Sequence, residues 1–189
     1  MKNKFDHKKI VHGVKLILEG IGENVRREGL TRTPERLAEF YEEVLSGMNE
    51  DPQVELRKYT TKNKDEMIIL KDISFFSLCE HHLLPFLGKV HICYIPQNNR
   101  MVGFSNMIRV VEIFSKRLQV QERLTSEIAD SIREALNAKG VLIVVEAEHL
   151  CLTMRGIKKP GSKIVTSAIR GVMRKDATRA EALALLERA

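Results

Sequence analysis

The sequence contains no long apolar run: none exceeds five residues, as in residues 141–145. A membrane-spanning helix needs roughly 18 apolar residues in succession, so we expect no membrane partner. The N-terminal residues 1–6 lack the apolar core of a secretory signal. Cysteine is scarce, and three residues, an odd count, argue against a disulfide framework and favour a reducing compartment. We therefore expect the protein in the cytoplasm.

Blocks of charge of one sign are also missing. The chain has 31 basic and 25 acidic residues, a formal net charge of +6. This excess favours an anionic partner, either nucleic acid or a small phosphorylated molecule. Acidic residues are interleaved with basic ones along most of the chain, as in residues 35–43. A small phosphorylated molecule is therefore favoured, and we expect no nucleic-acid partner.

The remaining composition is that of an ordinary folded domain, with 43% hydrophobic and 30% charged residues in a chain of 189. Helical spacing predicts a helix over residues 7–27, and Thr33-Pro34 suits the start of a second helix that ends at Gly47. The polar stretch 49–64 predicts a linker. We therefore divide the chain into an N-terminal helical region, 1–64, and a second unit, 65–189.

The second unit shows strand and helix patterns in the order β-β-α-α-β-β-α. We expect strands over 67–78, 88–96, 141–152 and 163–173, and helices over 105–118, over 121–138 (closed by Gly140) and from Asp176 onward. This order predicts an α+β fold in which an antiparallel sheet carries helices on one face. A sheet of four strands leaves its edges open, so we expect pairing between subunits.

A candidate metal site is found in Cys79-Glu80-His81-His82. Cys79 and His82 are three residues apart, which places both on one face of a helical turn. A third ligand is available in His149-Leu150-Cys151, because His149 and Cys151 share one face of the expected strand. Two thiolates and an imidazole form a three-ligand set with one open position, as in catalytic zinc sites. His81 and His149 would then lie beside the metal as proton donors and acceptors.

The same residues admit a simpler interpretation. Cys79 and Cys151 could equally be ordinary buried thiols, or form a disulfide on oxidation. Cys93 lies among apolar neighbours in the middle of an expected strand, so we predict that it belongs to the core.

Several residues could bind an anion or a purine. Gly103-Phe104-Ser105 leads into a helix, whose N-terminus presents free N–H groups, although Ser105 could simply cap that helix. Arg109 lies four residues further on, and Arg155 follows Cys151 by four residues. Gln121-Glu122 opens the next helix, and its carboxylate would suit the adjacent N–H donors of guanine.

Together these motifs resemble those of GTP cyclohydrolase I. The resemblance is carried by Cys79-Glu80-His81-His82, Gly103-Phe104-Ser105, Gln119-Val120-Gln121-Glu122-Arg123, and His149-Leu150-Cys151 with Arg155-Gly156. It extends from Thr33-Pro34-Glu35-Arg36 to Thr166-Ser167-Ala168, in the same order and with similar spacings.

The resemblance implies a tunnelling fold, in which ββααββ units assemble through their sheets into a toroidal homo-oligomer, typically a homodecamer. Residues 65–189 would be the catalytic domain and act as one functional unit. The implied reaction converts GTP and water to formate and 7,8-dihydroneopterin triphosphate, the first step toward folate and tetrahydropterins. The active sites would lie at subunit interfaces.

The resemblance also implies a role for each candidate residue. Zinc, one ion per subunit, would be bound by Cys79, His82 and Cys151, and would activate water to attack carbon 8 of guanine. The catalytic residues would be His81, His149 and Gln121. The substrate-binding residues would be Glu122 and Gln121 for guanine, Ser105, Arg109 and Arg155 for ribose and triphosphate, and Arg36 from a neighbouring subunit.

Two positions depart from the family pattern. Asn106 stands where a lysine is usual, and Glu39 stands where a basic residue is usual, both at positions that normally face the triphosphate. These departures leave open a paralogue with altered phosphate preference, or a non-catalytic ring protein that binds nucleotide. A nucleic-acid-binding module with structural zinc rests on the basic charge alone.

Overall fold

The computed structural model describes residues 5–56, 58–60, 66–98 and 100–187. Its helices are α1 (His7–Gly20), α2 (Thr33–Val44), α3 (Pro52–Glu55), α4 (Phe104–Ser115), α5 (Gln121–Leu136), α6 (Leu150–Thr153) and α7 (Asp176–Glu187), with the short 3-10 turns η1 (Ser46–Asn49) and η2 (Val172–Arg174). Its strands are β1 (Lys58–Thr60), β2 (Ile68–Cys79), β3 (Pro85–Ile95), β4 (Arg100–Val102), β5 (Leu118–Gln119), β6 (Gly140–His149) and β7 (Lys163–Gly171).

The main sheet has the strand order β5-β2-β3-β6-β7. Its four long strands pair antiparallel, as predicted. The short β5 was not predicted, and it pairs parallel to the end of β2, at Leu78 and Cys79. A separate two-stranded ribbon joins β1 to β4.

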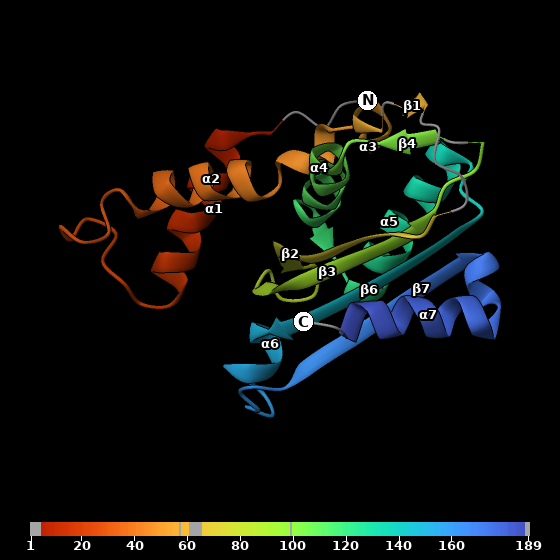
Figure 1. The fold of residues 1–189 in the computed structure, drawn as a ribbon. Helices are drawn as coiled ribbons and strands as arrows, with labels where there is room; N and C mark the ends of the chain where they lie inside the picture. The colour runs from red at the N-terminus through yellow and green to blue at the C-terminus, as the bar shows by residue number, and fades with distance from the viewer. Residues whose placement is uncertain (1–4, 57, 61–65, 99, 188–189) are drawn as a thin grey trace.

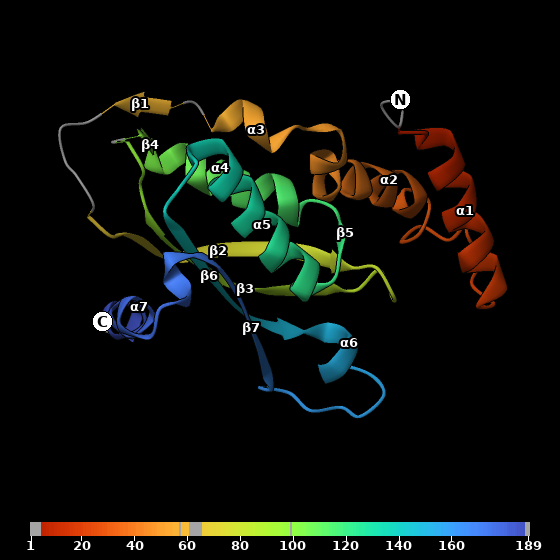
Figure 2. The same cartoon turned by 90° about the vertical axis from the view of Figure 1, so that its right-hand side faces the viewer.

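Helices α4 and α5 cover one face of this sheet (Figures 1 and 2). Alternate residues of each strand point toward them, as the two-residue period of a strand requires. On β3 these are Val90, Ile92 and Tyr94, each fully buried. They pack with Leu124 and Ile128 of α5 in the larger core cluster.

Helix α7 lies on the opposite face of the sheet (Figure 2). A second cluster forms there, in which Ala182 of α7 packs with Cys93, Leu142 and Met173. The prediction of helices on one face is therefore wrong for α7. The residues whose side chains point to the other face of the sheet, such as Cys93 and Leu142, are apolar too. This face must therefore also be buried by a helix. The prediction that Cys93 belongs to the core is confirmed, since its exposed fraction is 0%.

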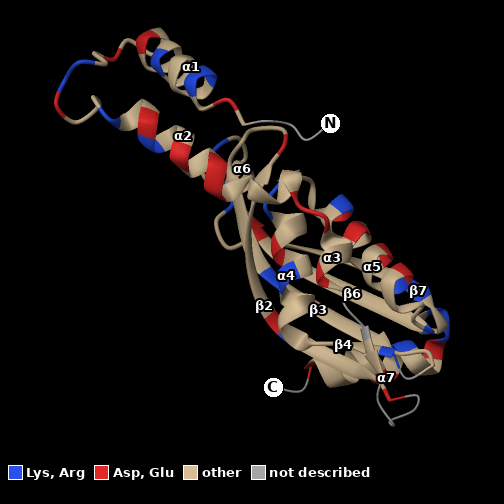
Figure 3. Ribbon diagram, turned by 90° about the horizontal axis from the view of Figure 1, so that it is seen from above, with Lys and Arg blue, Asp and Glu red and all other residues tan. Residues whose placement is uncertain are grey.

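The pair α1 and α2 extends away from the sheet (Figures 1 and 3). Gly47, in η1, lies against the backbone of Ile113 near the end of α4, and its carbonyl accepts a hydrogen bond of 2.9 Å from Nε of Arg117, two residues beyond that helix. Helix α1 carries three lysines and one glutamate, whereas α2 carries four glutamates and one arginine (Figure 3). None of the helices described is long and apolar enough to cross a lipid bilayer.

Several predicted boundaries need correction. Helix α1 ends at Gly20 rather than near residue 27, and Gly22 follows with a φ of 84°, a left-handed conformation that stops a helix. Helix α5 is closed by Asn137, with a φ of 48°, rather than by Gly140. Neither Thr33 nor Ser105 is an N-cap, because these positions are taken by Arg32 and Gly103.

The polar stretch after the N-terminal helices is more than a linker. It contains α3, which packs against α4, and β1, which pairs with β4. The predicted division between residues 64 and 65 falls outside the described residues.

Candidate metal centre

The turn between β2 and β3 brings Cys79 and His82 together. The N–H of Leu83 donates to the carbonyl of Cys79 at 2.8 Å, which closes one helical turn, and the N–H of Cys79 donates to the carbonyl of Leu84 at 2.9 Å. Leu83 has a φ of 54°, so the chain reverses there. The expected helical turn is therefore present, and it forms the turn of the β2–β3 hairpin.

Cys151 reaches the same place by a route that the sequence did not predict. Strand β6 ends at His149, and Leu150–Thr153 form the helical turn α6. Strand alternation therefore does not place Cys151, and that reasoning was wrong. Antiparallel pairing sets His149 opposite Phe86 on β3, beside the β2–β3 turn, and α6 then carries Cys151 toward Cys79.

The three predicted ligands form one group. Their ligand atoms, a sulfur from Cys79, a nitrogen from His82 and a sulfur from Cys151, all lie within 4.8 Å of one another. Burial, and then the neighbouring Cys79, raise the pKa of the Cys151 thiol. A bound cation would reverse this effect, because thiols that ligate a metal are deprotonated. Two sulfurs and one imidazole nitrogen with an open fourth position fit zinc.

His149 lies buried at the end of β6, and 9% of its surface is exposed. Its ring stacks on Phe86, with centroids 4.6 Å apart and an interplanar angle of 7°. Burial lowers the pKa of His149, against the opposing charge of Glu122. The imidazole is therefore neutral near neutral pH, with one ring nitrogen as donor and the other as acceptor.

The side chain of Gln121 decides which nitrogen of His149 carries the proton. Nε2 of Gln121 donates toward the carbonyls of Val145 and Ile164, each at 3.0 Å, and lies 3.1 Å from Oγ1 of Thr166. The amide oxygen therefore faces His149, with its Oε1 at 2.8 Å from Nε2 of the ring. Because that oxygen only accepts, Nε2 of His149 must donate, and Nδ1 keeps a free lone pair.

A polar network behind the turn involves residues whose roles the sequence reasoning missed. Arg123 forms an ion pair with Glu80, which lowers the pKa of that carboxyl. Its Nε donates to Oε1 of Gln119 at 2.9 Å. Helical spacing does not signal this pair, because Gln119 lies in β5 and Arg123 in α5. The network fixes the metal-binding turn against the start of α5.

His81 and Arg155 flank the three ligands. Nδ1 of His81 lies 3.7 Å from Sγ of Cys79. Nη1 of Arg155 lies 2.5 Å from Nε2 of His82. Glu122 lies exposed in the first turn of α5. The structure thus brings His81, His149, Gln121, Glu122 and Arg155 to the neighbourhood of the three predicted ligands.

The other predicted substrate-binding residues lie elsewhere in the same chain. Ser105 is in the first turn of α4, and the far end of that helix, near β5, lies about 15 Å away at the rise of an α-helix. Arg109 forms an ion pair of 3.6 Å with Glu55 of α3. Arg36 is exposed on α2. Among the described residues, no hydrogen bond or ion pair joins any of these three side chains to the cysteine–histidine cluster.

The two departures from the family pattern also lie away from the cluster. Nδ2 of Asn106 donates to the carbonyl of Glu55 at 2.6 Å, so this side chain ties α4 to α3. Glu39 is exposed on α2.

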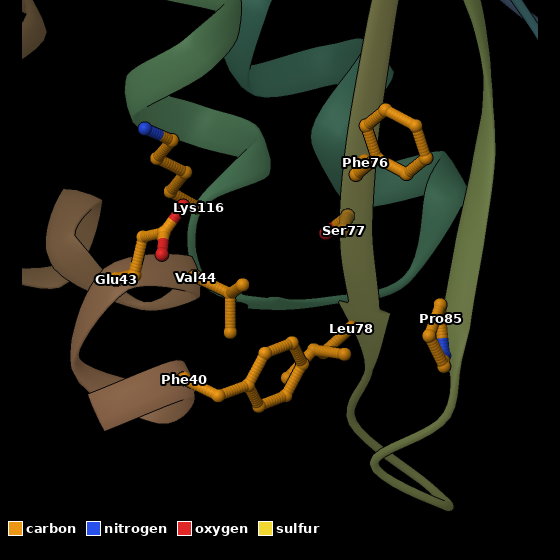
Figure 4. Close-up of a pocket in the computed structure, with 8 residues that line it drawn as sticks. All are labelled: Phe40, Glu43, Val44, Phe76, Ser77, Leu78, Pro85 and Lys116. Carbon is orange, nitrogen blue, oxygen red and sulfur yellow. The ribbon is translucent and has the colours of Figure 1, made fainter. Parts of the chain in front are cut away.

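The pocket of Figure 4, of about 320 Å³, lies between α2 and the end of β2, and Leu78, the residue before Cys79, is part of its lining. Its lining is mostly apolar, with Phe40 and Val44 from α2 facing Leu78 of β2 and Pro85 of β3. No metal ligand lines it. It is therefore a hydrophobic groove rather than part of the metal centre.

The fold and this cluster define a class: an α+β protein with a Cys–His–Cys group that could hold a metal ion at the end of its sheet, flanked by a buried neutral histidine. The comparisons with known proteins go further. The family model described as GTP cyclohydrolase I matches residues 10–187. The chain belongs to the GTP cyclohydrolase I family.

Similar proteins agree over nearly the whole chain. The chain is 58% identical over 184 residues to GTP cyclohydrolase 1 of Pelotomaculum thermopropionicum, covering 97% of this chain and 98% of that one. It is 53% identical over 186 residues to GTP cyclohydrolase 1 of Clostridioides difficile, covering 97% and 98%. A solved archaeosine synthase QueF-like structure overlaps 58% of this chain and 97% of that one, with a TM-score of 0.46 and 16% identity.

Proposed function

We propose that this protein is a zinc-dependent hydrolase that converts GTP and water to formate and 7,8-dihydroneopterin triphosphate. The observation that carries the proposal is the convergence of Cys79, His82 and Cys151 beside the buried His149, in a chain of the GTP cyclohydrolase I family. Family membership does not favour the alternative of a non-catalytic ring protein.

The metal would be zinc, one ion per subunit, held by Cys79, His82 and Cys151. When bound, zinc supplies Lewis-acid chemistry, polarising a substrate or lowering the pKa of water. Cys79 is 5% exposed, so water is excluded from its side of the site, whereas His82 is exposed to solvent. A substrate would enter from that side.

Proton transfer falls to His149 and His81. His149 offers the free lone pair of Nδ1, and its neutral state at neutral pH suits a proton acceptor. Gln121 keeps the ring proton of His149 on Nε2, so we assign Gln121 a positioning role in catalysis. His81 is exposed beside Cys79 and can exchange protons with water.

The guanine edge would be bound by Glu122, whose carboxylate can accept from two adjacent N–H groups of the base. The amide nitrogen of Gln121 is already occupied by Val145, Ile164 and Thr166. Glu122 would therefore be the main anchor, and Gln121 would assist by holding the surrounding strands in place.

The phosphates would be bound across subunits. Arg155 lies at the metal centre, whereas Ser105 and Arg109 lie further along α4 and Arg36 lies on α2. We propose that neighbouring copies supply these three residues, so that a complete active site requires a homo-oligomer. Strand β7, and the part of β2 that β5 does not pair with, leave open edges that suit assembly into a ring, and we propose a toroidal homodecamer.

Asn106 and Glu39 should weaken the binding of the triphosphate. A hydrogen bond to a charged group contributes about 1.5–3 kcal/mol, and two positive charges of the usual pattern are missing at these positions. We therefore expect a weaker affinity for GTP than a chain with both basic residues would have.

The test is formate release from GTP by the purified protein, with a chelator and after zinc is added back. We expect formate that chelation abolishes and zinc restores, together with a fluorescent neopterin after oxidation. Cys151→Ser should lose zinc and activity while the oligomer persists, and Cys93→Ala serves as the matched control outside the cluster. A zinc-loaded, assembled protein that releases no formate would overturn the proposal.

A further inference from the structure

Arg123, in the first turn of α5, contacts three acceptors in the β2–β3 turn and in the short strand beside it. Its guanidinium forms an ion pair with Glu80, the residue after Cys79. Its Nη2 also donates to the carbonyl of Leu118 at 2.9 Å, and its Nε donates to Oε1 of Gln119 at 2.9 Å. A guanidinium is planar and carries five N–H donors, so this one side chain holds all three acceptors in a fixed arrangement.

Strand β5 holds Cys79 in place, although it contains only two residues. Gln119 pairs with Cys79 itself, and the carbonyl of Gln119 accepts from the N–H of Glu80 at 3.0 Å. Strands usually have roughly 3–10 residues, so a pairing this short needs support from outside its own ladder. The bonds from Arg123 to the Leu118 carbonyl and to the Gln119 side chain supply that support.

Gln119 anchors the guanidinium of Arg123 in the protein interior. Gln119 is 1% exposed, and its Nε2 donates to the carbonyl of Phe114 at 3.1 Å and to Oε2 of Glu127 at 2.8 Å. Its Oε1 therefore accepts from Arg123. An isolated ion pair on a surface contributes little, because two long side chains must be ordered to form it. Here the buried amide already orders the arginine that meets Glu80.

The first turn of α5 therefore holds the candidate metal centre from two sides. Gln121 contacts His149 at the end of β6, two residues before Cys151. Arg123 contacts the turn that begins at Cys79. Residues two apart on a helix point in different directions. A single turn of helix can therefore reach both of the segments that bring the ligands together.

We propose that Arg123 is a positioning residue that sets the geometry of the metal centre. It acts through Glu80 and β5, which fix the position of the β2–β3 turn relative to Cys151. Residues outside the ligand set commonly change metal affinity by about 10–100-fold when they are substituted. The choice of zinc as the metal rests on the proposed function, whereas the contacts of Arg123 do not.

The first test measures zinc affinity by competition with a chromophoric chelator. Arg123→Lys keeps the charge but loses the planar fork, so its ammonium cannot hold all three acceptors. We expect zinc to bind this variant about ten-fold more weakly than the unaltered protein. Equal zinc affinities in these two proteins would overturn the proposal.

Arg170→Lys is the matched control for a general loss of stability. Arg170 also forms an ion pair with α5, through bonds of 2.6 and 3.0 Å to the carboxylate of Asp130, but it joins that helix to β7. Arg170→Lys should therefore bind zinc as the unaltered protein does. A loss of zinc affinity equal to that of Arg123→Lys would contradict a specific role of Arg123.

The absorption spectrum of the cobalt-substituted protein gives a readout that a loss of stability alone would not change. The visible bands of Co²⁺ depend on the arrangement of its ligands. At saturating Co²⁺, Arg123→Lys should have shifted or weaker bands, whereas Arg170→Lys should have the spectrum of the unaltered protein. Identical spectra in all three proteins would refute the positioning role.

Glu80→Gln keeps the proposal testable if Arg123→Lys does not fold, because it alters only an exposed side chain. Loss of this ion pair should weaken zinc binding by about three-fold and shift the cobalt bands in the same direction. Glu134→Gln, at an exposed glutamate further along α5, is the control. A Glu80→Gln variant with unchanged affinity and spectrum overturns the role of Arg123 alone. An unaltered protein that binds no zinc overturns the proposed function as well.

Discussion

At residue 121, an uncharged side chain controls the protonation state of a neighbouring histidine. Gln121 is 1% exposed, and its amide nitrogen is directed at two backbone carbonyls, so only its oxygen can face His149. A glutamate carboxylate could not donate to those carbonyls. An apolar residue could neither donate to them nor accept from His149. The identity of this residue thus sets both the packing of β6 against α5 and the free lone pair on His149.

Substitution of this amide tests that control. Gln121→Met keeps the volume but leaves buried polar groups without partners, so we expect a loss of about 1–3 kcal/mol in the free energy of unfolding. Nitrogen NMR should show that His149 loses its preference for a proton on Nε2. Thr166→Val is the control, because it removes one contact of Gln121 and leaves the histidine bond. An unchanged tautomer in Gln121→Met would contradict the assignment.

Cys93 and Cys151 should differ sharply in reactivity. Burial raises the pKa of the Cys93 thiol to about 12, so almost none of it is thiolate at neutral pH. In zinc-free protein, iodoacetamide should modify the partly exposed Cys151 and leave Cys93 intact until the chain is unfolded. Mass spectrometry of the tryptic peptides would measure this, and zinc should protect Cys151. Labelling of Cys93 in the folded protein would refute the prediction.

At the scale of elements, β2 contains a bulge in its pairing with β3, and this bulge depends on a neutral histidine. Their register shifts between Leu70 and Ile73, and Asp72 in the bulge has a φ of 58°. The N–H of Asp72 donates to Nδ1 of His91 at 3.2 Å, so that nitrogen must be unprotonated. Burial lowers the pKa of His91. Lys71 and Lys89 act in the same direction, and Asp72 and Glu146 act against them.

The hydrogen bond between Asp72 and the neutral ring of His91 predicts a loss of stability in acid. The pKa of His91 is lower in the folded state than its ordinary 6.5, so the unfolded chain binds more protons as the pH falls. The free energy of unfolding should therefore decrease as the pH falls through about 6.5. Urea midpoints at a series of pH values would measure it. His91→Gln should make the profile shallower and leave the contribution of His149, whose pKa burial also lowers, whereas His12→Gln, at an exposed histidine on α1, should not change it.

At the scale of the whole molecule, the projecting helices expose apolar surface that a single chain leaves uncovered. Ile17 of α1 and Ile21, the residue that follows this helix, are 64% and 69% exposed, and Phe40 of α2, which lines the groove of Figure 4, is 40% exposed. Large exposed apolar patches mark interaction sites. These helices are therefore expected to contact other copies in the proposed oligomer.

A charge placed on α1 tests this expectation. Ile17→Asp should reduce the mass of the assembly, because each buried aliphatic side chain contributes about 1.5–3 kcal/mol to association. Sedimentation velocity would measure the mass, and circular dichroism would verify that the helices persist. Lys15→Asp, on the same helix, is the control. An assembly of unchanged mass in Ile17→Asp would exclude α1 from the interface.

The sequence alone determined the features that depend on short-range patterns. Helical and two-residue periods located α2, α4, α5 and the four long strands to within a few residues. The pair Cys79 and His82 could be predicted because three residues of spacing define one turn. The end of α1 and the cap of α5 were misplaced, since only the backbone conformations of Gly22 and Asn137 decide them.

The tertiary structure decided the features that depend on residues distant in sequence. Antiparallel pairing of β3 with β6 carried Cys151 to Cys79, although the predicted strand ended in the helical turn α6. The bonds from Gln121 to His149 and from Arg155 to His82 have no signature in any local pattern. Period and spacing fix which face of an element a residue occupies, whereas the packing of separate elements fixes which side chains that face will meet.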